Sequence, residues 1–382
     1  MERMSPLSTP LRVLIVDDSA LFRKVLQNVL KEDQRFEVAG AARNGAEALD
    51  LAAAAKPDVM ILDVEMPVMD GLETLTAVRR SHPGIEVIMF SSLTRSGAEI
   101  TFQALEKGAM DFVAKPEADS PAAGLSTIRG DLIPKLTFLH TRKTLRRITS
   151  EPRTSPAPKI ERKTEIKTIE PVPAFRPRTI RSHKRRVVAL GISTGGPKAL
   201  AEMMPQLPGN MEAGLLIVQH MPPVFTQTLA QRLDGLCPLE VREAKEGDLV
   251  KSGLALVAPG GRHMVVARET SKTDAVEIKL LDTPPENSCR PSADVLFRSV
   301  AAAYGPEAVG VIMTGMGSDG AAALKLMKER GAHVIAQNKE TCTVFGMPKK
   351  PVEEGWADEV LPLEDIASAI ARSVLGINLE AK

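Results

Sequence analysis

Three side chains in the C-terminal half of the chain have the types needed for nucleophilic catalysis, and each follows a short apolar run. They are Ser193 after RVVALG (186–191), His220 after GLLIVQ (214–219), and Asp319 shortly after AVGVIM (308–313). A serine hydroxyl becomes a useful nucleophile when a base takes its proton and an acid orients that base. If the three runs are neighbouring parallel strands, their side chains project from one edge of the sheet. The spacing therefore predicts a serine hydrolase site.

The residues around Ser193 support this prediction. Gly191-Ile192-Ser193-Thr194-Gly195 fits the G-x-S-x-G pattern, a sharp strand-to-helix turn whose glycines permit tight backbone geometry. Free N–H groups near the following helix could stabilise an oxyanion. We expect these donors at the main chain of Thr194 and in the glycine-rich loop 315–317, which contains Met316.

Each of these signals has an alternative interpretation. His263, in GRHM, is a second candidate base; His220 is favoured because the strand of a strand–loop–helix unit ends at it. Asp319 could instead cap a helix that begins at Gly320. Gly191 to Ala199 imitates a phosphate-binding P-loop, but proline occupies the lysine position. Gly315-x-Gly317-x-x-Gly320 imitates a dinucleotide fingerprint, but the next strand, HVIAQN (333–338), lacks the expected terminal acid.

A second group of polar residues follows apolar runs in the N-terminal half. Asp17 and Asp18 follow LRVLIV (11–16), Asp63 follows DVMIL (58–62), Ser91 follows IEVIMF (85–90), and Lys115 follows MDFV (110–113). Carboxylates that converge at one sheet edge repel one another unless a cation is present, and such oxygen ligands suit Mg²⁺. Lys115 would then meet a phosphoryl group, and Asp63 would be the nucleophile that forms an aspartyl phosphate. Ser19 and Asp70 are better interpreted as helix N-caps.

Both groups of residues require α/β architecture. Apolar runs alternate with amphipathic helical patterns over 11–140, the last of which has Leu125, Ile128, Leu132, Leu136 and Leu139 on one face. The alternation resumes over 187–376, with a β-rich insert at 239–281. We therefore expect two doubly wound parallel-sheet domains, a five-stranded N-terminal domain (1–140) and a Rossmann-like hydrolase domain (187–382).

The two domains are separated by a basic segment. Residues 141–186 contain 15 Lys/Arg, 4 Asp/Glu and six prolines, although the whole chain of 382 residues has a net charge of only +1. This composition predicts a flexible linker. A basic stretch can bind nucleic acid or anionic lipid, but the segment lacks interleaved aromatic residues and helical periodicity, so a solvated tether is favoured and no nucleic-acid partner is expected.

The remaining composition indicates a cytoplasmic protein. No apolar run is long enough to cross a bilayer, and the N-terminus lacks the features of a signal peptide. The three cysteines, Cys237, Cys289 and Cys342, form neither a disulfide framework nor a CxxC metal motif. We expect them to be free and mostly buried thiols in a reducing compartment.

The first domain resembles response-regulator receiver domains. The resemblance is carried by VDDS (16–19), LDVEMPVMDG (62–71), SS (91–92) and FVAKP (112–116). It implies that Asp63 is the phosphorylated residue and that Asp17, Asp18, Asp63 and the carbonyl of Glu65 bind Mg²⁺. It also implies that Ser91 and Lys115 contact the phosphoryl group and that Phe112 is the aromatic switch. A sensor histidine kinase would be the phosphodonor.

The second domain resembles the chemotaxis protein-glutamate methylesterase family. The resemblance is carried by GISTGGPKAL (191–200), QHMPPVFT (219–226), APGGRHM (258–264), RPSADVLFRSV (290–300), MTGMGSDGA (313–321) and AQN…CTVFGMP (336–348). It implies hydrolysis of glutamate methyl esters on chemoreceptors without a cofactor, release of methanol, and deamidation of receptor glutamines. Ser193, His220 and Asp319 fall on the family's nucleophile, base and acid. A different hypothesis is a non-enzymatic response regulator whose linker binds DNA, which predicts strongly salt-dependent affinity.

Overall fold

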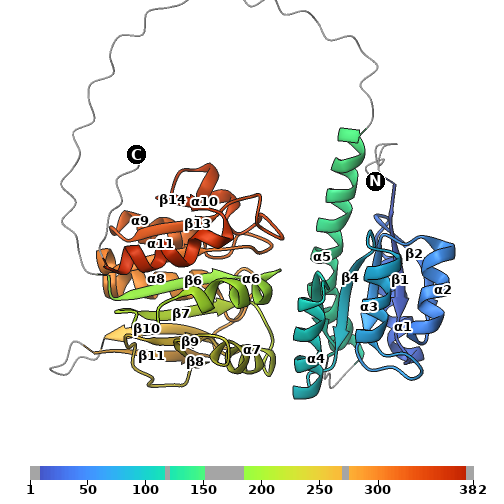
Figure 1. The fold of residues 1–382 in the computed structure, drawn as a ribbon, viewed down its shortest axis with the longest axis horizontal. Coiled ribbons are helices and arrows are strands. Elements are labelled where there is room, and N and C mark those ends of the chain that lie inside the picture. Colours follow the sequence, from blue (N-terminus) through green and yellow to red (C-terminus); the bar gives the residue numbers. More distant parts are fainter. Residues whose placement is uncertain (1–8, 117–120, 151–184, 269–274, 376–382) are drawn as a thin grey trace, which may run out of the picture.

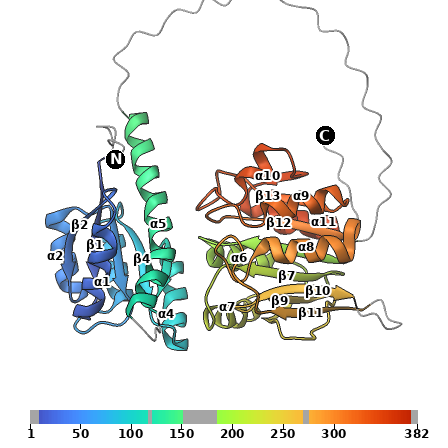
Figure 2. The ribbon, with the colours of Figure 1, turned by 180° about the vertical axis from the view of Figure 1, so that it is seen from behind.

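The computed structural model describes residues 9–116, 121–150, 185–268 and 275–375. They form two α/β domains that lie side by side, and both views of the ribbon show α4 and α5 of the first domain facing α6 and α7 of the second (Figures 1 and 2). In the described part of the chain, no helix combines the length and the apolar character that a membrane span requires.

The first domain is a five-stranded parallel sheet in the order β2-β1-β3-β4-β5. Its strands are β1 (Leu11–Val16), β2 (Phe36–Ala42), β3 (Val59–Asp63), β4 (Glu86–Ser91) and β5 (Asp111–Ala114). Its helices are α1 (Ala20–Lys31), α2 (Gly45–Ala55), α3 (Gly71–Ser81), α4 (Arg95–Glu106) and α5 (Pro121–Ser150). Strands β1, β3, β4 and β5 are mostly buried and appear in the sequence as apolar runs, whereas the edge strand β2 is only partly buried.

The two predicted helix caps differ. The Asp70 side chain accepts a hydrogen bond from the Glu73 amide, and the Glu73 side chain accepts one from the Asp70 amide. Both hydrogen bonds of a capping box are therefore present at α3. Ser19 occupies the N-cap position of α1, but its side chain makes no capping hydrogen bond.

Helix α5 is longer than the sequence patterns suggested. Residues 141–150, which we assigned to the flexible linker, are helical. The extension is held to the sheet because Arg142 pairs with Glu86, and Lys143 pairs with Asp58 at 2.5 Å. The rest of the predicted linker, up to residue 184, lies outside the described residues.

The second domain has a seven-stranded sheet in the order β14-β13-β12-β6-β7-β9-β8, in which every pairing is parallel. The strands are β6 (Val187–Ile192), β7 (Gly214–Gln219), β8 (Glu240–Glu243), β9 (Leu254–Val257), β12 (Ala308–Ile312), β13 (His333–Gln337) and β14 (Glu359–Leu361). The α-helices are α6 (Gly196–Met203), α7 (Phe225–Asp234), α8 (Ala293–Tyr304), α9 (Ala321–Glu329), α10 (Lys349–Glu353) and α11 (Leu363–Leu375). Two short 3₁₀ turns, η1 (Met204–Gln206) and η2 (Gly305–Glu307), complete the domain.

The predicted β-rich insert is divided between two sheets. Strands β8 and β9 extend the main parallel sheet, whereas β10 (His263–Arg268) and β11 (Val276–Leu281) form a separate antiparallel pair. The β-rich stretch expected at 239–281 is confirmed, but only β10 and β11 stand apart from the main sheet. Short apolar runs look alike in the sequence whether they pair within a main sheet or outside it.

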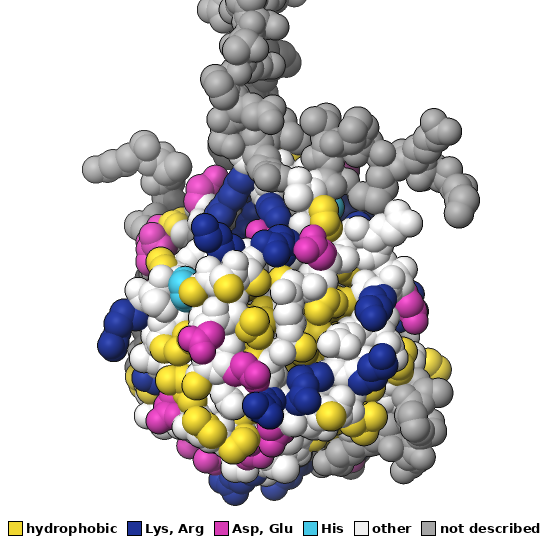
Figure 3. Space-filling view, turned by 90° about the vertical axis from the view of Figure 1, so that its right-hand side faces the viewer, with side chains coloured by type: hydrophobic (Ala, Val, Ile, Leu, Met, Phe, Trp, Pro, Cys, Tyr) yellow, Lys and Arg dark blue, Asp and Glu magenta, His cyan; other side chains and the backbone are white. Residues whose placement is uncertain are grey.

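The domain interface is closely packed. Phe102 and Leu105 of α4 meet Pro197 of α6 and Leu229 and Leu233 of α7 around a residual cavity of about 10 Å³. Arg232 pairs with Glu106 across the interface, and Arg95 Nη2 donates to Gln231 Oε1 at 3.0 Å. On the opposite, outward side of the first domain, the described residues show acidic and basic side chains mixed with hydrophobic ones (Figure 3).

Candidate active site

The strand order places the three predicted catalytic residues at one edge of the second sheet. Strand β6 lies between β12 and β7, and Ser193, His220 and the Asp319 loop follow these three strands directly. The Ser193 amide donates to the Thr314 carbonyl at 3.0 Å, and the His220 amide donates to the Ile192 carbonyl at 3.2 Å. The expectation that these strands are neighbours is confirmed.

Glycines allow the chain to turn tightly at Ser193. Gly195 has φ of +77°, a conformation that L side chains rarely adopt. At Gly315, an added Cβ would lie 2.8 Å from the Cβ of Ser193, so the 315–317 loop packs directly against the nucleophile turn. Among the described residues, the amides of Thr194 and Met316 donate to no acceptor. Both amides therefore remain candidates for the predicted oxyanion donors.

The His220 ring contacts two side chains, one at each nitrogen. Nε2–H donates to Asp319 Oδ2 at 2.8 Å, and the Cys289 thiol lies 3.5 Å from Nδ1. Among the described residues, no hydrogen bond joins the Ser193 hydroxyl to the ring. The structure thus brings His220 and Asp319 into contact and places Ser193 on the neighbouring strand end. The Cys289 thiol lies at Nδ1, the ring nitrogen that is left to accept a proton from Ser193.

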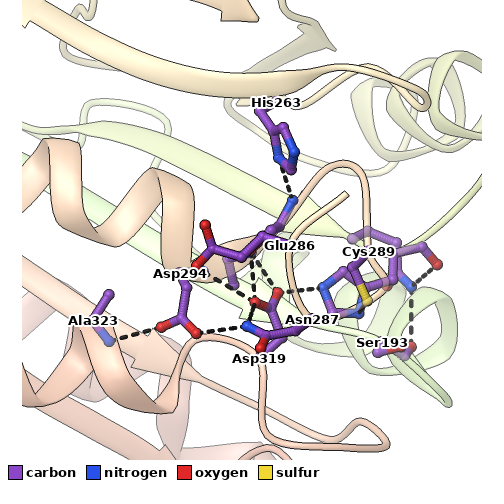
Figure 4. A network of polar contacts seen from close by, with 12 residues as sticks. Ser193, His263, Glu286, Asn287, Cys289, Asp294, Asp319 and Ala323 are labelled. Atoms are coloured by element: carbon purple, nitrogen blue, oxygen red, sulfur yellow. Dashed lines mark hydrogen bonds and ion pairs between the residues drawn. The ribbon is translucent and has the colours of Figure 1, made fainter. Parts of the chain in front are cut away.

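Asp319 is held by donors from the start of α8. It accepts from Ser292 Oγ at 2.6 Å, from the Ala293 amide at 2.6 Å and from Asn287 Nδ2 at 2.8 Å (Figure 4). Burial disfavours the ionised carboxylate, but His220 and these donors outweigh it and lower the pKa of Asp319 to about 2. Asp319 does not cap α9, because the N-cap residue of that helix is Gly320.

The same contacts change the pKa of His220. Burial of the His220 ring opposes protonation, but the hydrogen bond to Asp319 and the contact with Cys289 outweigh it and raise the pKa of His220 to about 9. Both contacts therefore favour the protonated form of the ring. A histidine that is to accept a proton from a serine must first be deprotonated.

A tight turn carries two site residues that the sequence did not single out. Glu286 and Cys289 exchange backbone hydrogen bonds of 3.1 and 2.8 Å, with positive φ at Asn287 and Ser288. The turn places Asn287 between Asp319 and Asp294, and it places Cys289 at His220. The only sequence signal is their position just before the RPSADVLFRSV motif. The prediction that the three cysteines are free thiols is confirmed, and each of them is partly buried.

His263 is not placed as a base. Its side chain is fully buried, its Nδ1 accepts from the Ser292 amide at 3.2 Å, and its Nε2 donates to the Pro284 carbonyl at 3.1 Å. Both nitrogens hold loops in position. The competing assignment of the base is therefore not supported by the geometry.

The polar residues of the first domain converge at the C-terminal edge of its sheet. Lys115 Nζ lies 3.0 Å from Asp17 Oδ2 and 2.7 Å from Asp63 Oδ2. Carboxylate oxygens of Asp17, Asp18 and Asp63 lie within 4.8 Å of one another. Burial, and then the charge of Asp17, raise the pKa of Asp63 to about 6, although Lys115 opposes the shift.

These acids fit a divalent cation. The Oδ2 atoms of Asp17 and Asp63 are buried and accept no hydrogen bond of good geometry from the described residues, and the Lys115 ammonium is the cation beside them. Buried carboxylate oxygens that lack a hydrogen-bond donor are suitable ligands for Mg²⁺. Asp18 is exposed, so an ion would retain water on that side.

Ser91 ends β4, and Phe112 lies within β5. The Ser91 hydroxyl donates to the Gly97 carbonyl at 3.1 Å, which ties it to the first turn of α4. Phe112 points away from the acids toward the second domain, where its ring stacks on Phe225. The candidate switch residue is therefore part of the domain interface.

Comparison with known proteins matches both halves of the chain. Residues 13–122 match the response regulator receiver domain family, and residues 188–370 match the CheB methylesterase family. A protein-glutamate methylesterase/protein-glutamine glutaminase from Desulfotalea psychrophila is 44% identical over 95% of this chain and 98% of its own length. One from Trichodesmium erythraeum, with the same name, is 41% identical over 95% and 99%. A crystal structure of the Thermotoga maritima CheB methylesterase catalytic domain covers 49% of this chain and 98% of its own, with 41% identity and a TM-score of 0.48. The chain belongs to the protein-glutamate methylesterase/protein-glutamine glutaminase family, with a receiver domain in front of the methylesterase domain.

Proposed function

We propose that this protein hydrolyses glutamate methyl esters on the signalling domains of chemoreceptors and releases methanol, with Ser193 as nucleophile, His220 as base and Asp319 as acid. The observation that carries the proposal is the 2.8 Å contact between His220 and Asp319 at the strand end next to Ser193. The whole-length similarity to proteins named for this activity supports the choice of substrate.

The proposed chemistry is acyl transfer. Because Asp319 engages Nε2 of His220, Nδ1 is the nitrogen that takes the proton from Ser193. Ser193 attacks the ester carbonyl, and the amides of Thr194 and Met316 stabilise the oxyanion. His220 then gives the proton to the departing methanol, and water releases the glutamate side chain. For this cycle, the Cys289 thiol must leave the position at Nδ1 that it occupies here.

The same site suits deamidation of receptor glutamines. An amide carbonyl presents the same geometry to Ser193 as an ester, and His220 would protonate departing ammonia in place of methanol. The names of the relatives include protein-glutamine glutaminase, which supports the assignment.

The first domain is proposed to receive a phosphoryl group on Asp63 from a sensor histidine kinase. Asp17, Asp18, Asp63 and the carbonyl of Glu65 would hold Mg²⁺, which neutralises phosphate charge during transfer. Lys115 pairs with the acceptor carboxylate and is positioned to pair with the phosphoryl oxygens. Ser91 would exchange its bond to Gly97 for a bond to the phosphoryl group, which loosens the start of α4.

Phosphorylation is proposed to release the second domain. In the unphosphorylated arrangement, α4 packs against α6 and α7, the helices that follow Ser193 and His220. Thr194, next to Ser193, lies near the Asp111 carboxylate of the receiver and opposes the rise in the pKa of Asp111 that burial causes. A receiver held in this place restricts the approach of a receptor. We expect the protein to act in the cytoplasm, where its three free thiols stay reduced.

The test is methanol release from purified methylated receptors, with and without a small phosphodonor and Mg²⁺. Release that increases on phosphorylation supports the proposal, and ammonia release from unmodified receptors tests the glutaminase activity. If the intact enzyme released no methanol from any methylated receptor under both conditions, the proposed function would be wrong.

A further inference from the structure

The contact between Cys289 and His220 has the dimensions of a metal-binding pair. Sγ lies 3.5 Å from Nδ1. Two ligands on a tetrahedral Zn²⁺, with a Zn–S bond of about 2.3 Å and a Zn–N bond of about 2.0 Å, lie about 3.5 Å apart. The sulfur and the nitrogen are therefore already at the separation that a shared zinc ion requires.

The opposite side of the ring completes the arrangement that metal-binding histidines usually have. Asp319 accepts the Nε2–H of His220 at 2.8 Å, and such a carboxylate fixes the ring and increases the basicity of the other nitrogen. Asp319 is itself held by Ser292 and Asn287. Ligand atoms of His220, Cys289 and Asp319 all lie within 4.8 Å of one another.

We propose that Cys289 and His220 form a binding site for a thiophilic divalent cation such as Zn²⁺, with Asp319 as the residue that orients the ring. Cys289 is only partly buried, and water or the Ser193 hydroxyl would fill the remaining positions on the ion. Thiolate and imidazole are poor ligands for Mg²⁺, which binds carboxylates and water instead. The site is therefore distinct in chemistry from the acids of the receiver.

The bound ion blocks hydrolysis. When the ion binds, the proton of the Cys289 thiol and any proton on Nδ1 are both lost to solvent, so that a metal–thiolate bond forms and Nδ1 donates its freed lone pair to the metal, while Nε2 keeps the proton that it donates to Asp319. Nδ1 can then no longer accept the proton of Ser193. This consequence rests on the proposed role of His220, whereas the binding site itself does not.

Cobalt absorbance tests the site without an activity assay. Co²⁺ is added to the intact, reduced protein in excess Mg²⁺, which saturates the receiver acids. The expected result is a near-ultraviolet thiolate-to-cobalt charge-transfer band in the wild type and in Cys237→Ser, a variant of another half-exposed thiol. The band disappears in Cys289→Ser. A wild type without the band, or a Cys289→Ser variant that retains it, overturns the proposal.

Inhibition tests the consequence. Each variant's methanol release is measured against Zn²⁺ concentration and normalised to its own metal-free rate. We expect Zn²⁺ but not Mg²⁺ to inhibit the wild type and Cys237→Ser, and Cys289→Ser to need about tenfold more Zn²⁺ or more. Equal sensitivity of wild type and Cys289→Ser rejects inhibition through this pair. Absence of methanol release in the metal-free wild type would instead count against the proposed function, and the cobalt band would still decide the site.

Discussion

The ring of Phe112 stacks on the ring of Phe225, with centroids 4.4 Å apart and planes inclined by 15°. Phe112 lies in β5, the last strand of the receiver, and Phe225 begins α7, directly after the loop that starts at His220. Between the loop and the helix, Val224 has φ of +70°, a strained conformation for a β-branched residue. The proposed switch residue of the receiver is therefore packed against the helix that follows the His220 loop.

Charge reversal at the interface should activate the unphosphorylated enzyme. Glu106→Lys would place a cation against Arg232, with which Glu106 pairs in the closed arrangement. Because repulsion disfavours the closed state, we expect methanol release without a phosphodonor to rise about fivefold or more. Asp50→Lys, on the exposed side of α2, makes the same change in charge away from the interface and is the control. Equal rates for the two variants would show that this interface does not restrain the enzyme.

Phosphorylation should depend on Asp63 and on Mg²⁺. Asp63→Asn keeps the size of the side chain but removes the nucleophilic carboxylate beside Lys115. We expect no phosphoryl incorporation by mass spectrometry and no stimulation of methanol release by a phosphodonor. A chelator should have the same effect on the wild type. Stimulation that persists in Asp63→Asn would place the regulatory phosphoryl group elsewhere.

Removal of the Ser193 hydroxyl should remove nearly all esterase activity. Ser193→Ala leaves the turn glycines and the oxyanion donors in place, so the fold should be retained while kcat falls by roughly 10⁴-fold or more. Ser368→Ala, an exposed serine on α11 of the same domain, should retain the wild-type rate. Near-normal turnover by Ser193→Ala would exclude it as the nucleophile.

Asp319 should matter for both rate and stability. Asp319→Asn replaces a charged acceptor of the Ser292 hydroxyl and the Ala293 amide with a neutral one, and it removes the charge that favours the His220 proton. We expect kcat to fall by about 10⁴-fold and the free energy of unfolding to fall by about 1–3 kcal/mol. Steady-state kinetics and denaturant unfolding measure the two effects. A large loss of stability with an unchanged rate would assign Asp319 a purely structural role.

The pH dependence of hydrolysis should report the contact between Cys289 and His220. The base acts when deprotonated, so kcat/KM rises with pH through the pKa of His220, which is raised to about 9 in the free enzyme. The thiol contact contributes to that rise in pKa, and Cys289→Ala should move the ascending limb to lower pH. The profiles are measured with a chelator present. An ascending limb at the same pH in both proteins would mean that Cys289 does not tune the base.

The sequence determined the two α/β domains and most of the residues at their sheet edges. Continuous apolar runs mark buried parallel strands, and Asp17, Asp63, Ser193 and His220 each follow such a run, so the polar edge can be located from local order alone. The helical extension to Ser150 was missed because it depends on pairs such as Arg142 with Glu86, which are far apart in the chain.

Only the tertiary structure decided what surrounds the base. Cys289 and Asn287 reach His220 and Asp319 through a tight turn, and nothing in their local sequence indicates a partner on another strand end. The stacking of Phe112 on Phe225 likewise joins residues from two separate domains. Local periodicity encodes strands and helices, whereas contacts between distant residues depend on how those elements pack. For this reason the proposed nucleophile, base and acid could be named from the sequence, and the thiol beside His220 could not.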